Sequence, residues 1–120
     1  MFELKRQLEK QIDSNYTTTD LFFYGSNYDV SNLDQWVQVM YNPIDSKIVS
    51  SDVSCTVEAG SVIVSASDTT LTNAMVLIDE IMTIIHNGTD YNYGNTITFT
   101  QGSLENSLWF CTATISVETK

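Results

Sequence analysis

The feature of this sequence that most restricts its fold is an apolar repeat of helical period between residues 71 and 85. Its members recur every three or four positions: Leu71, Ala74, Met75, Ile78, Ile81, Met82 and Ile85. This spacing predicts an amphipathic helix, with Asp68 or Thr69 as its N-cap. Leu77 and Ile84 widen the apolar arc to roughly half the circumference, more than the stripe expected of a surface helix. We therefore expect cover on two sides: a sheet on one, and another helix or a neighbouring subunit on the other.

Strand patterns flank this helix. Residues 53–59 and 61–66 predict a hairpin, with its turn at Glu58-Ala59-Gly60-Ser61. After the helix, Asp90 to Gly94 has the composition of a turn-rich loop, and Asn95 to Thr100 predicts a short strand. The last strand, Leu108 to Val117, alternates strictly. Its apolar side faces one way and its threonine-rich side the other.

The first half of the chain carries weaker signals. Apolar residues that recur every four positions predict a short helix over residues 2–14: Leu4, Leu8 and Ile12. Residues 21–24 and 36–41 predict two strands, separated by a polar loop over 25–35. Pro43 cannot donate a ladder hydrogen bond, so we expect the second strand to end or kink there.

The order of these elements is helix, four strands, helix, two strands. This order predicts an α+β fold: a mostly antiparallel sheet with two helices packed on one face. The chain has 120 residues with one proline and five glycines, and it has no linker-like stretch. We therefore expect a single domain over residues 1–120.

The charge is unevenly distributed. The net charge is −10, yet the first ten residues hold three cations: Lys5, Arg6 and Lys10. The rest of the chain holds only Lys47 and Lys120 against thirteen acids. A body this acidic repels nucleic acid, which argues against sequence-reading on DNA. The acidity has two readings that stay open: solubility, or a surface to which nucleic acid does not adhere.

No residue pattern predicts a catalytic residue, a cofactor or a metal. His86, the one histidine, falls at the end of the predicted helix, where it can hydrogen-bond free carbonyls. Asp79 and Glu80 are adjacent on that helix and diverge by about 100°, which predicts a solvated face and not a metal site. Asp29 and Asp34 lack the glycine and closing glutamate of a calcium loop. The two cysteines fall in apolar strand patterns and predict buried free thiols: Cys55 and Cys111.

The candidate functional residues are contact residues. The N-terminal cations could bind phosphate or meet the acidic face of an adjacent copy. Tyrosines in predicted loops favour contact with a partner. The second apolar side of the long helix also needs cover. The candidate interface with another copy or a partner is therefore Lys5, Arg6, Lys10, Leu77, Ile81, Ile84, Tyr91 and Tyr93. No apolar run reaches membrane-spanning length, and no signal peptide is recognisable, so we expect a protein made in a cytoplasm.

The order of elements resembles the tail terminator family of long-tailed bacteriophages, whose members cap the head-proximal end of the tail tube. The resemblance spans nearly the whole chain and follows the N-terminal helix with Leu4, Leu8 and Ile12, the segments Leu21 to Tyr24, Trp36 to Tyr41 and Gly60 to Val64, the helix Leu71 to Ile85, and a closing hairpin that ends in Trp109 to Ile115. It is an order of elements and not a residue signature. The family has no catalytic residues to transfer.

The resemblance implies a ring, usually of six copies, in the tail or neck of the virion. Such a ring binds the last ring of tail-tube protein, stops polymerisation and presents a surface to the head–tail connector. Genome passes through its lumen without specific binding, and an acidic lining would reduce phosphate adhesion there. Three alternatives stay open: another neck or connector protein, a monomeric acidic inhibitor that imitates DNA, or a small-ligand domain with Tyr91, Tyr93 and His86 near a pocket.

Overall fold

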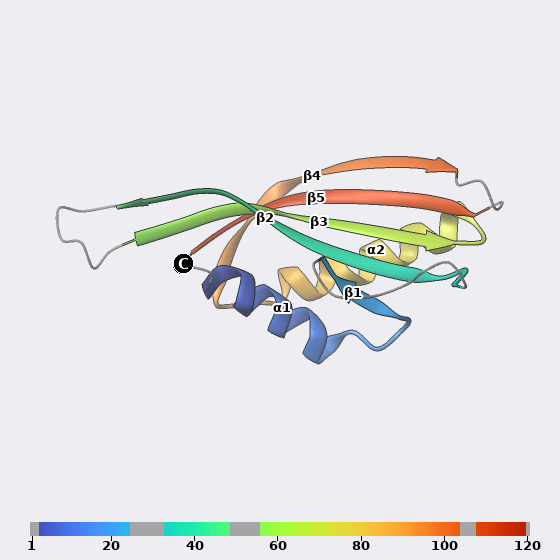
Figure 1. Ribbon diagram of the computed structural model, residues 1–120, viewed down its shortest axis with the longest axis horizontal. Helices are drawn as coiled ribbons and strands as arrows, with labels where there is room; N and C mark the ends of the chain where they lie inside the picture. Colours follow the sequence, from blue (N-terminus) through green and yellow to red (C-terminus); the bar gives the residue numbers. More distant parts are fainter. Residues whose placement is uncertain (1–2, 25–32, 49–55, 104–107, 120) are drawn as a thin grey trace.

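The computed structural model describes residues 3–24, 33–48, 56–103 and 108–119. Two helices and five strands follow in the order α1 (Glu3–Asn15), β1 (Leu21–Phe23), β2 (Trp36–Ile48), β3 (Thr56–Asp68), α2 (Leu71–His86), β4 (Tyr91–Ser103) and β5 (Trp109–Thr119). The strands form one sheet in the order β1-β2-β3-β5-β4 (Figure 1). β1 runs parallel to β2, and the other neighbours are antiparallel. The predicted α+β fold, with helices packed on a mostly antiparallel sheet, is confirmed.

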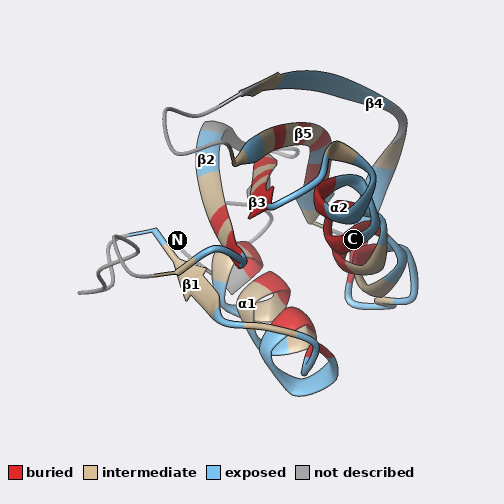
Figure 2. Cartoon of the chain, turned by 90° about the vertical axis from the view of Figure 1, so that its right-hand side faces the viewer, coloured by how far each residue is buried: buried red, intermediate tan, exposed pale blue. Residues whose placement is uncertain are grey.

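The core lies between the helices and one face of the sheet (Figure 2). The α1 stripe of Leu4, Leu8 and Ile12 is buried there, as the spacing predicts. Alternate strand residues complete the layer: Val37, Val39, Val62, Val64, Ala66, Cys111, Ala113, Ile115 and Val117. Apolar residues repeat every second position in the strands and about every 3.6 positions in the helices, so each element has one apolar side, and these sides face one another in the core.

The N-cap of α2 is neither of the two residues predicted from the sequence. Thr70 is the N-cap, because its Oγ1 accepts a hydrogen bond of 3.2 Å from the backbone N–H of Asn73. Asp68, predicted as a cap, is buried instead. Its carboxylate accepts from the backbone N–H of Thr69 at 2.6 Å and from Gln35 Nε2 at 2.7 Å. Asp68 thus ties the end of β3 to the segment that leads into β2.

The predicted turn at Glu58 to Ser61 is wrong, because β3 runs through it as one continuous strand. In the part of the chain that the structure describes, the sheet therefore has five strands where the sequence predicted six. Gly60 sits in the strand because the Tyr41 ring and the Asn42 carbonyl lie against its Cα. A Cβ at Gly60 would lie 2.7 Å from Asn42 O and 2.8 Å from Tyr41 Cε2. A glycine inside a strand here marks close approach and not a turn.

Two further strand predictions need correction. β2 does not end at Pro43 but continues to Ile48, with a register shift between Pro43 and Asp45. On its β1 side, β2 is paired only at Val37 to Val39 within the described residues. Pro43 lies beyond that paired stretch, so the backbone N–H that proline lacks costs the sheet little there. The predicted loop at Asp90 to Gly94 is also wrong, since β4 already begins at Tyr91.

The hairpin of β2 and β3 projects beyond the two helices at one end of the molecule (Figure 1). The molecule is accordingly elongated, with extents of 54 × 29 × 23 Å. The start of the predicted strand at Val53 and most of the predicted loop over 25–35 lie outside the described residues.

Candidate interaction surface

Helix α2 has one flank that is covered within the subunit. This covered flank faces α1 and the sheet, and it buries Leu77 and Ile81 to 3% and 0% exposure. Ile84 is half-buried against the same core. These three residues, predicted as an interface, therefore belong to the core of the single chain, because α1 supplies the second cover that the wide apolar arc requires.

Polar side chains fasten the covered flank. Gln11 Nε2 on α1 donates a hydrogen bond of 3.1 Å to the Ile84 carbonyl of α2. Thr18, just after α1, donates from its Oγ1 to Glu80 Oε2 at 2.6 Å. Tyr16, which lies between Gln11 and Thr18 in the sequence, is also buried. Its burial, together with the nearby Glu80 carboxylate, raises the pKa of its hydroxyl. Helix α1 is thus held to α2 by apolar packing and by directed hydrogen bonds.

The opposite flank of α2 is open. It borders an apolar groove of about 540 Å³, lined by Thr72, Met75, Val76, Ile78, Asp79 and Met82 of α2, Ile97 and Phe99 of β4, and Ala113 of β5. Four large apolar side chains remain 39–50% exposed here: Met75, Val76, Ile97 and Phe99. We call this the α2–β4 groove. Met75, predicted from its spacing as a core residue, lies on its rim.

The register of the strands explains why the groove is open. Phe99 pairs with Ala113, which pairs with Val64, so Phe99 lies on the face of the sheet that the helices cover. Helix α2 packs over β3 and β5. β4 is one strand further out, at the edge of the sheet. Its helix-facing side chains therefore extend past the helix and remain in contact with solvent.

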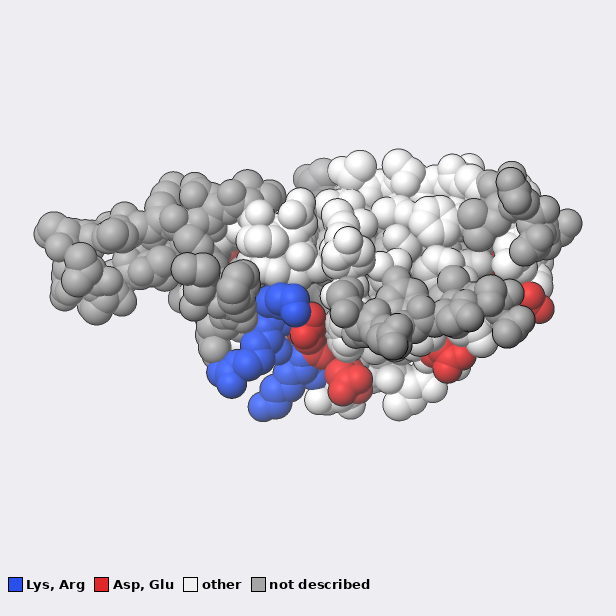
Figure 3. Space-filling view, in the orientation of Figure 1, with Lys and Arg blue, Asp and Glu red and all other residues white. Residues whose placement is uncertain are grey.

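The predicted cations gather on α1. Every Lys and Arg whose side chain is described lies on this helix (Figure 3). Lys5 Nζ pairs with Glu9 Oε1 at 2.8 Å, one turn further along. Arg6 and Lys10 are exposed and line a shallow hollow with Gln7, Gln11, Ser14 and Asp90. The described cations are therefore confined to α1, which also carries Glu3, Glu9 and Asp13 and so has no formal net charge.

The two tyrosines predicted as loop contacts have different environments. Tyr91 is buried, and its hydroxyl donates a hydrogen bond of 2.7 Å to the Ile85 carbonyl at the end of α2. Burial, with smaller contributions from Asp90 and Tyr93, raises its pKa to about 12. Gly88 makes room for this ring, since a Cβ there would collide with the Tyr91 hydroxyl. Tyr91 is a core residue and not a contact residue.

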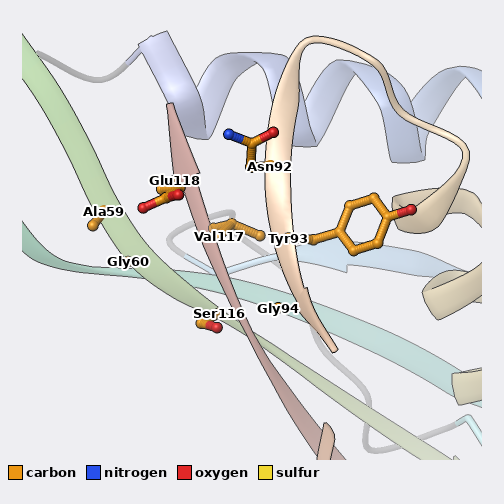
Figure 4. Close-up of a pocket in the computed structure, with 8 residues that line it drawn as sticks. All are labelled: Ala59, Gly60, Asn92, Tyr93, Gly94, Ser116, Val117 and Glu118. Carbon is orange, nitrogen blue, oxygen red and sulfur yellow. The ribbon is translucent and has the colours of Figure 1, made fainter. Parts of the chain in front are cut away.

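Tyr93 is 38% exposed and stacks on His86, with ring centroids 4.5 Å apart and planes at 25°. The role predicted for His86, bonding the last helix carbonyls, falls to Tyr91 and Gln11 instead. Figure 4 shows the small hollow beside Tyr93, whose ring points away from Glu118. This hollow of about 300 Å³ is lined by Ala59, Gly60, Asn92, Tyr93, Gly94, Ser116, Val117 and Glu118. It offers one carboxylate and small neutral groups.

The remaining sequence predictions concern single side chains. Cys111 is buried as predicted, and burial raises the pKa of its thiol. Cys55 and Asp29 lie outside the described residues. Trp36 is buried, with its ring centroid 6.1 Å from that of Phe110. Within the described ranges, no three His, Cys, Asp or Glu side chains come together as metal ligands, and no helix has the length and apolarity to cross a bilayer.

The α2–β4 groove was not predicted. The available signal was the alternation of Ile97 and Phe99 with threonines, which marks one apolar strand face.

Comparison of the sequence with protein-family models and with curated proteins finds no match.

Proposed function

We propose that this protein is a ring-forming structural protein of a bacteriophage tail. In this proposal, about six copies form a ring that caps the tail tube, stops its polymerisation and joins it to the head connector. The order of elements supports this reading, since α1, the sheet, α2 and the closing hairpin follow one another as in the tail terminator family. The proposal assigns a contact role to the molecule and no reaction.

The observation that carries the proposal is the α2–β4 groove. It places four large, partly exposed apolar side chains together on a chain of net charge −10: Met75, Val76, Ile97 and Phe99. Contiguous apolar surface of this kind marks an interaction site in a folded domain. The other flank of α2 is covered by α1 and the sheet, so the groove is the apolar surface that this helix leaves for a partner.

The open face of the sheet carries few charges, which suits the passage of DNA nearby. This face, turned away from the helices, carries mostly hydroxyl and amide side chains, among them Gln38, Ser65, Thr112 and Thr114. Among the residues of this face whose side chains the structure describes there is no Lys or Arg, and Figure 3 shows the face largely uncharged. A surface without cations does not hold phosphates. The acids are spread over both helices, over β2, β3 and β5, and over the connections between them, whereas a DNA mimic needs them in rows on one face.

The proposal is tested on the purified full-length chain. Sedimentation velocity across a range of concentrations, with negative-stain electron microscopy, should reveal rings with a central opening. Mixed with tail tubes assembled from the tube protein of the same genome, the protein should bind at one tube end and stop growth. A protein that stays monomeric at every concentration and does not bind tubes overturns the proposal, and recovery of a DNA-binding enzyme as its partner favours the DNA-mimic alternative.

A further inference from the structure

We propose, on the basis of the ring-forming function above, that copies of this chain join head to tail through the α2–β4 groove. The occupant of the groove is the α1–β1 side of a second copy, which brings an exposed aromatic residue and the cations of α1. The two surfaces are different, so each copy has one of each to offer. Three observations carry this assignment.

The first observation is an apolar match. Tyr24 directly follows β1 and is 63% exposed, the largest exposure among the described large apolar residues. Its backbone is fixed, since the Tyr24 N–H donates a hydrogen bond of 2.9 Å to the Val39 carbonyl of β2. Binding therefore costs this residue little backbone freedom, and a tyrosine has few rotatable side-chain bonds to order, which suits an interface anchor. The groove, with Val76 and Phe99 half-exposed, is the apolar surface that such an anchor requires.

The second observation is a charge match. Asp79 is exposed on α2 at the rim of the groove. Lys10 is exposed on α1, which precedes β1 in the chain, whereas Lys5 on the same helix already pairs with Glu9. One side of the molecule thus offers an exposed lysine and an aromatic residue, and the other offers a carboxylate beside an apolar groove. Complementary charges select the partner and fix its register.

The third observation is the direction in which the two surfaces face. Figure 2 shows β1 on one side of the molecule and α2 on the other, with α1 between them. Figure 3 shows the cations of α1 on the face that in Figure 1 is turned toward the viewer, whereas α2 lies behind the strands there. A subunit can therefore contact one neighbour with each side. Unlike surfaces that pair in this way generate a closed ring when the rotation closes.

A charge-reversal cycle tests the pairing. We expect Asp79→Lys alone and Lys10→Asp alone each to weaken ring formation about tenfold or more, as close charge pairs across interfaces do. The double variant should assemble within about threefold of the wild type, since the pair is restored with reversed sign. Glu118→Lys is the matched control. It makes the same charge change on the open sheet face, outside the groove, and should leave assembly unchanged. Sedimentation velocity measures each variant after circular dichroism has verified folding.

Cysteine cross-linking tests the geometry without changing charge. In a Cys55→Ser background, Tyr24→Cys and Val76→Cys are prepared as two separate proteins and then mixed under mild oxidation. Head-to-tail contact predicts disulfide dimers in the mixture and none in either protein alone. Dimers from Val76→Cys alone would indicate groove-to-groove contact and overturn the proposal.

The outcomes separate this inference from the proposed function. A wild-type chain that forms no rings and binds no tubes removes both. Rings that form equally well with Asp79→Lys, and show no cross-link between positions 24 and 76, remove the pairing and leave the tail function standing.

Discussion

The two flanks of helix α2 share one apolar helix but differ in how they are covered. Toward α1, Leu77 and Ile81 are buried, and Gln11 fastens the contact by bonding the Ile84 carbonyl. Toward β4, Val76 is 50% exposed and Phe99 is 39% exposed. The first flank completes the subunit, and the second leaves apolar surface in contact with water. This difference shows that the width of an apolar arc predicts how much of a helix must be buried, but not which element buries it.

The sharpest test of this difference is one truncation on each flank. Ile81→Ala removes a fully buried side chain, and we expect it to lower the free energy of unfolding by about 2–5 kcal/mol. Val76→Ala on the open flank should change it by less than about 0.5 kcal/mol at concentrations where the chain is monomeric. Urea unfolding followed by circular dichroism measures both. Equal losses would show that the open flank is packed inside the isolated subunit.

The next largest effect concerns Tyr91, which closes the C-terminal end of α2. Its pKa is raised from 10.0 to about 12, chiefly by burial, so folding favours the neutral phenol. The stabilisation is therefore full below pH 10 and is lost as the pH rises through about 12. Over this window the free energy of unfolding should fall by roughly 1.4 kcal/mol per pH unit for Tyr91, with an additional loss from Tyr16.

Tyr91→Phe separates the two tyrosines. At neutral pH it removes this hydrogen bond, while the Ile85 carbonyl still accepts from the Gly88 N–H, so it should cost about 0.5–1.5 kcal/mol. Above pH 10 its stability should fall less steeply than that of the wild type, since the contribution of Tyr91 is gone while those of Tyr16 and the buried Cys111 thiol remain. Chemical unfolding at several pH values measures the slopes. An unchanged slope would contradict the buried-phenol account.

The fold was largely predictable because its elements follow simple periods. The helices predicted over 2–14 and 71–85 are α1 and α2, each within one residue of its observed bounds. The last strand alternates as predicted. The errors lie at glycine and proline. A glycine such as Gly60 is typical of a turn, but here it packs under the Tyr41 ring of the neighbouring strand. No local sequence pattern encodes this contact between strands.

The candidate site was less predictable, because burial depends on which elements meet in space. The spacing of Leu77 and Ile81 shows that they are apolar and share one side of α2. It does not show that α1 folds back over them. Tyr91 and Tyr93 look equivalent in sequence and share one face of β4, yet Tyr91 is buried against the end of α2 and Tyr93 stacks on the exposed His86. The groove arises from the position of β4 at the sheet edge, which follows from strand order and not from composition.

A smaller effect is expected from the hydrogen bond that fastens the covered flank. Gln11→Ala removes the donor to the Ile84 carbonyl, a half-buried contact between the two helices. We expect a loss of about 1 kcal/mol in the free energy of unfolding, the usual net contribution of such a bond. Gln7→Ala, one turn earlier on α1, is the matched control and should cost less than about 0.5 kcal/mol. If the two variants are equally stable, apolar packing alone holds this flank.

The smallest effect should come from the cations of α1, although they are the most visible charge feature of the molecule. Lys5 pairs with Glu9 one turn away, and both side chains are 30–40% exposed. Such a pair stabilises a helix by about 0.3–0.5 kcal/mol, and less with the lysine on the N-terminal side. Lys5→Ala should therefore change monomer stability by only a few tenths of a kcal/mol, and added salt should remove the difference. Thermal unfolding at low and high salt measures it. Because the fold gains so little from these cations, a larger effect of the same substitution on ring formation would place their role between subunits and not within one.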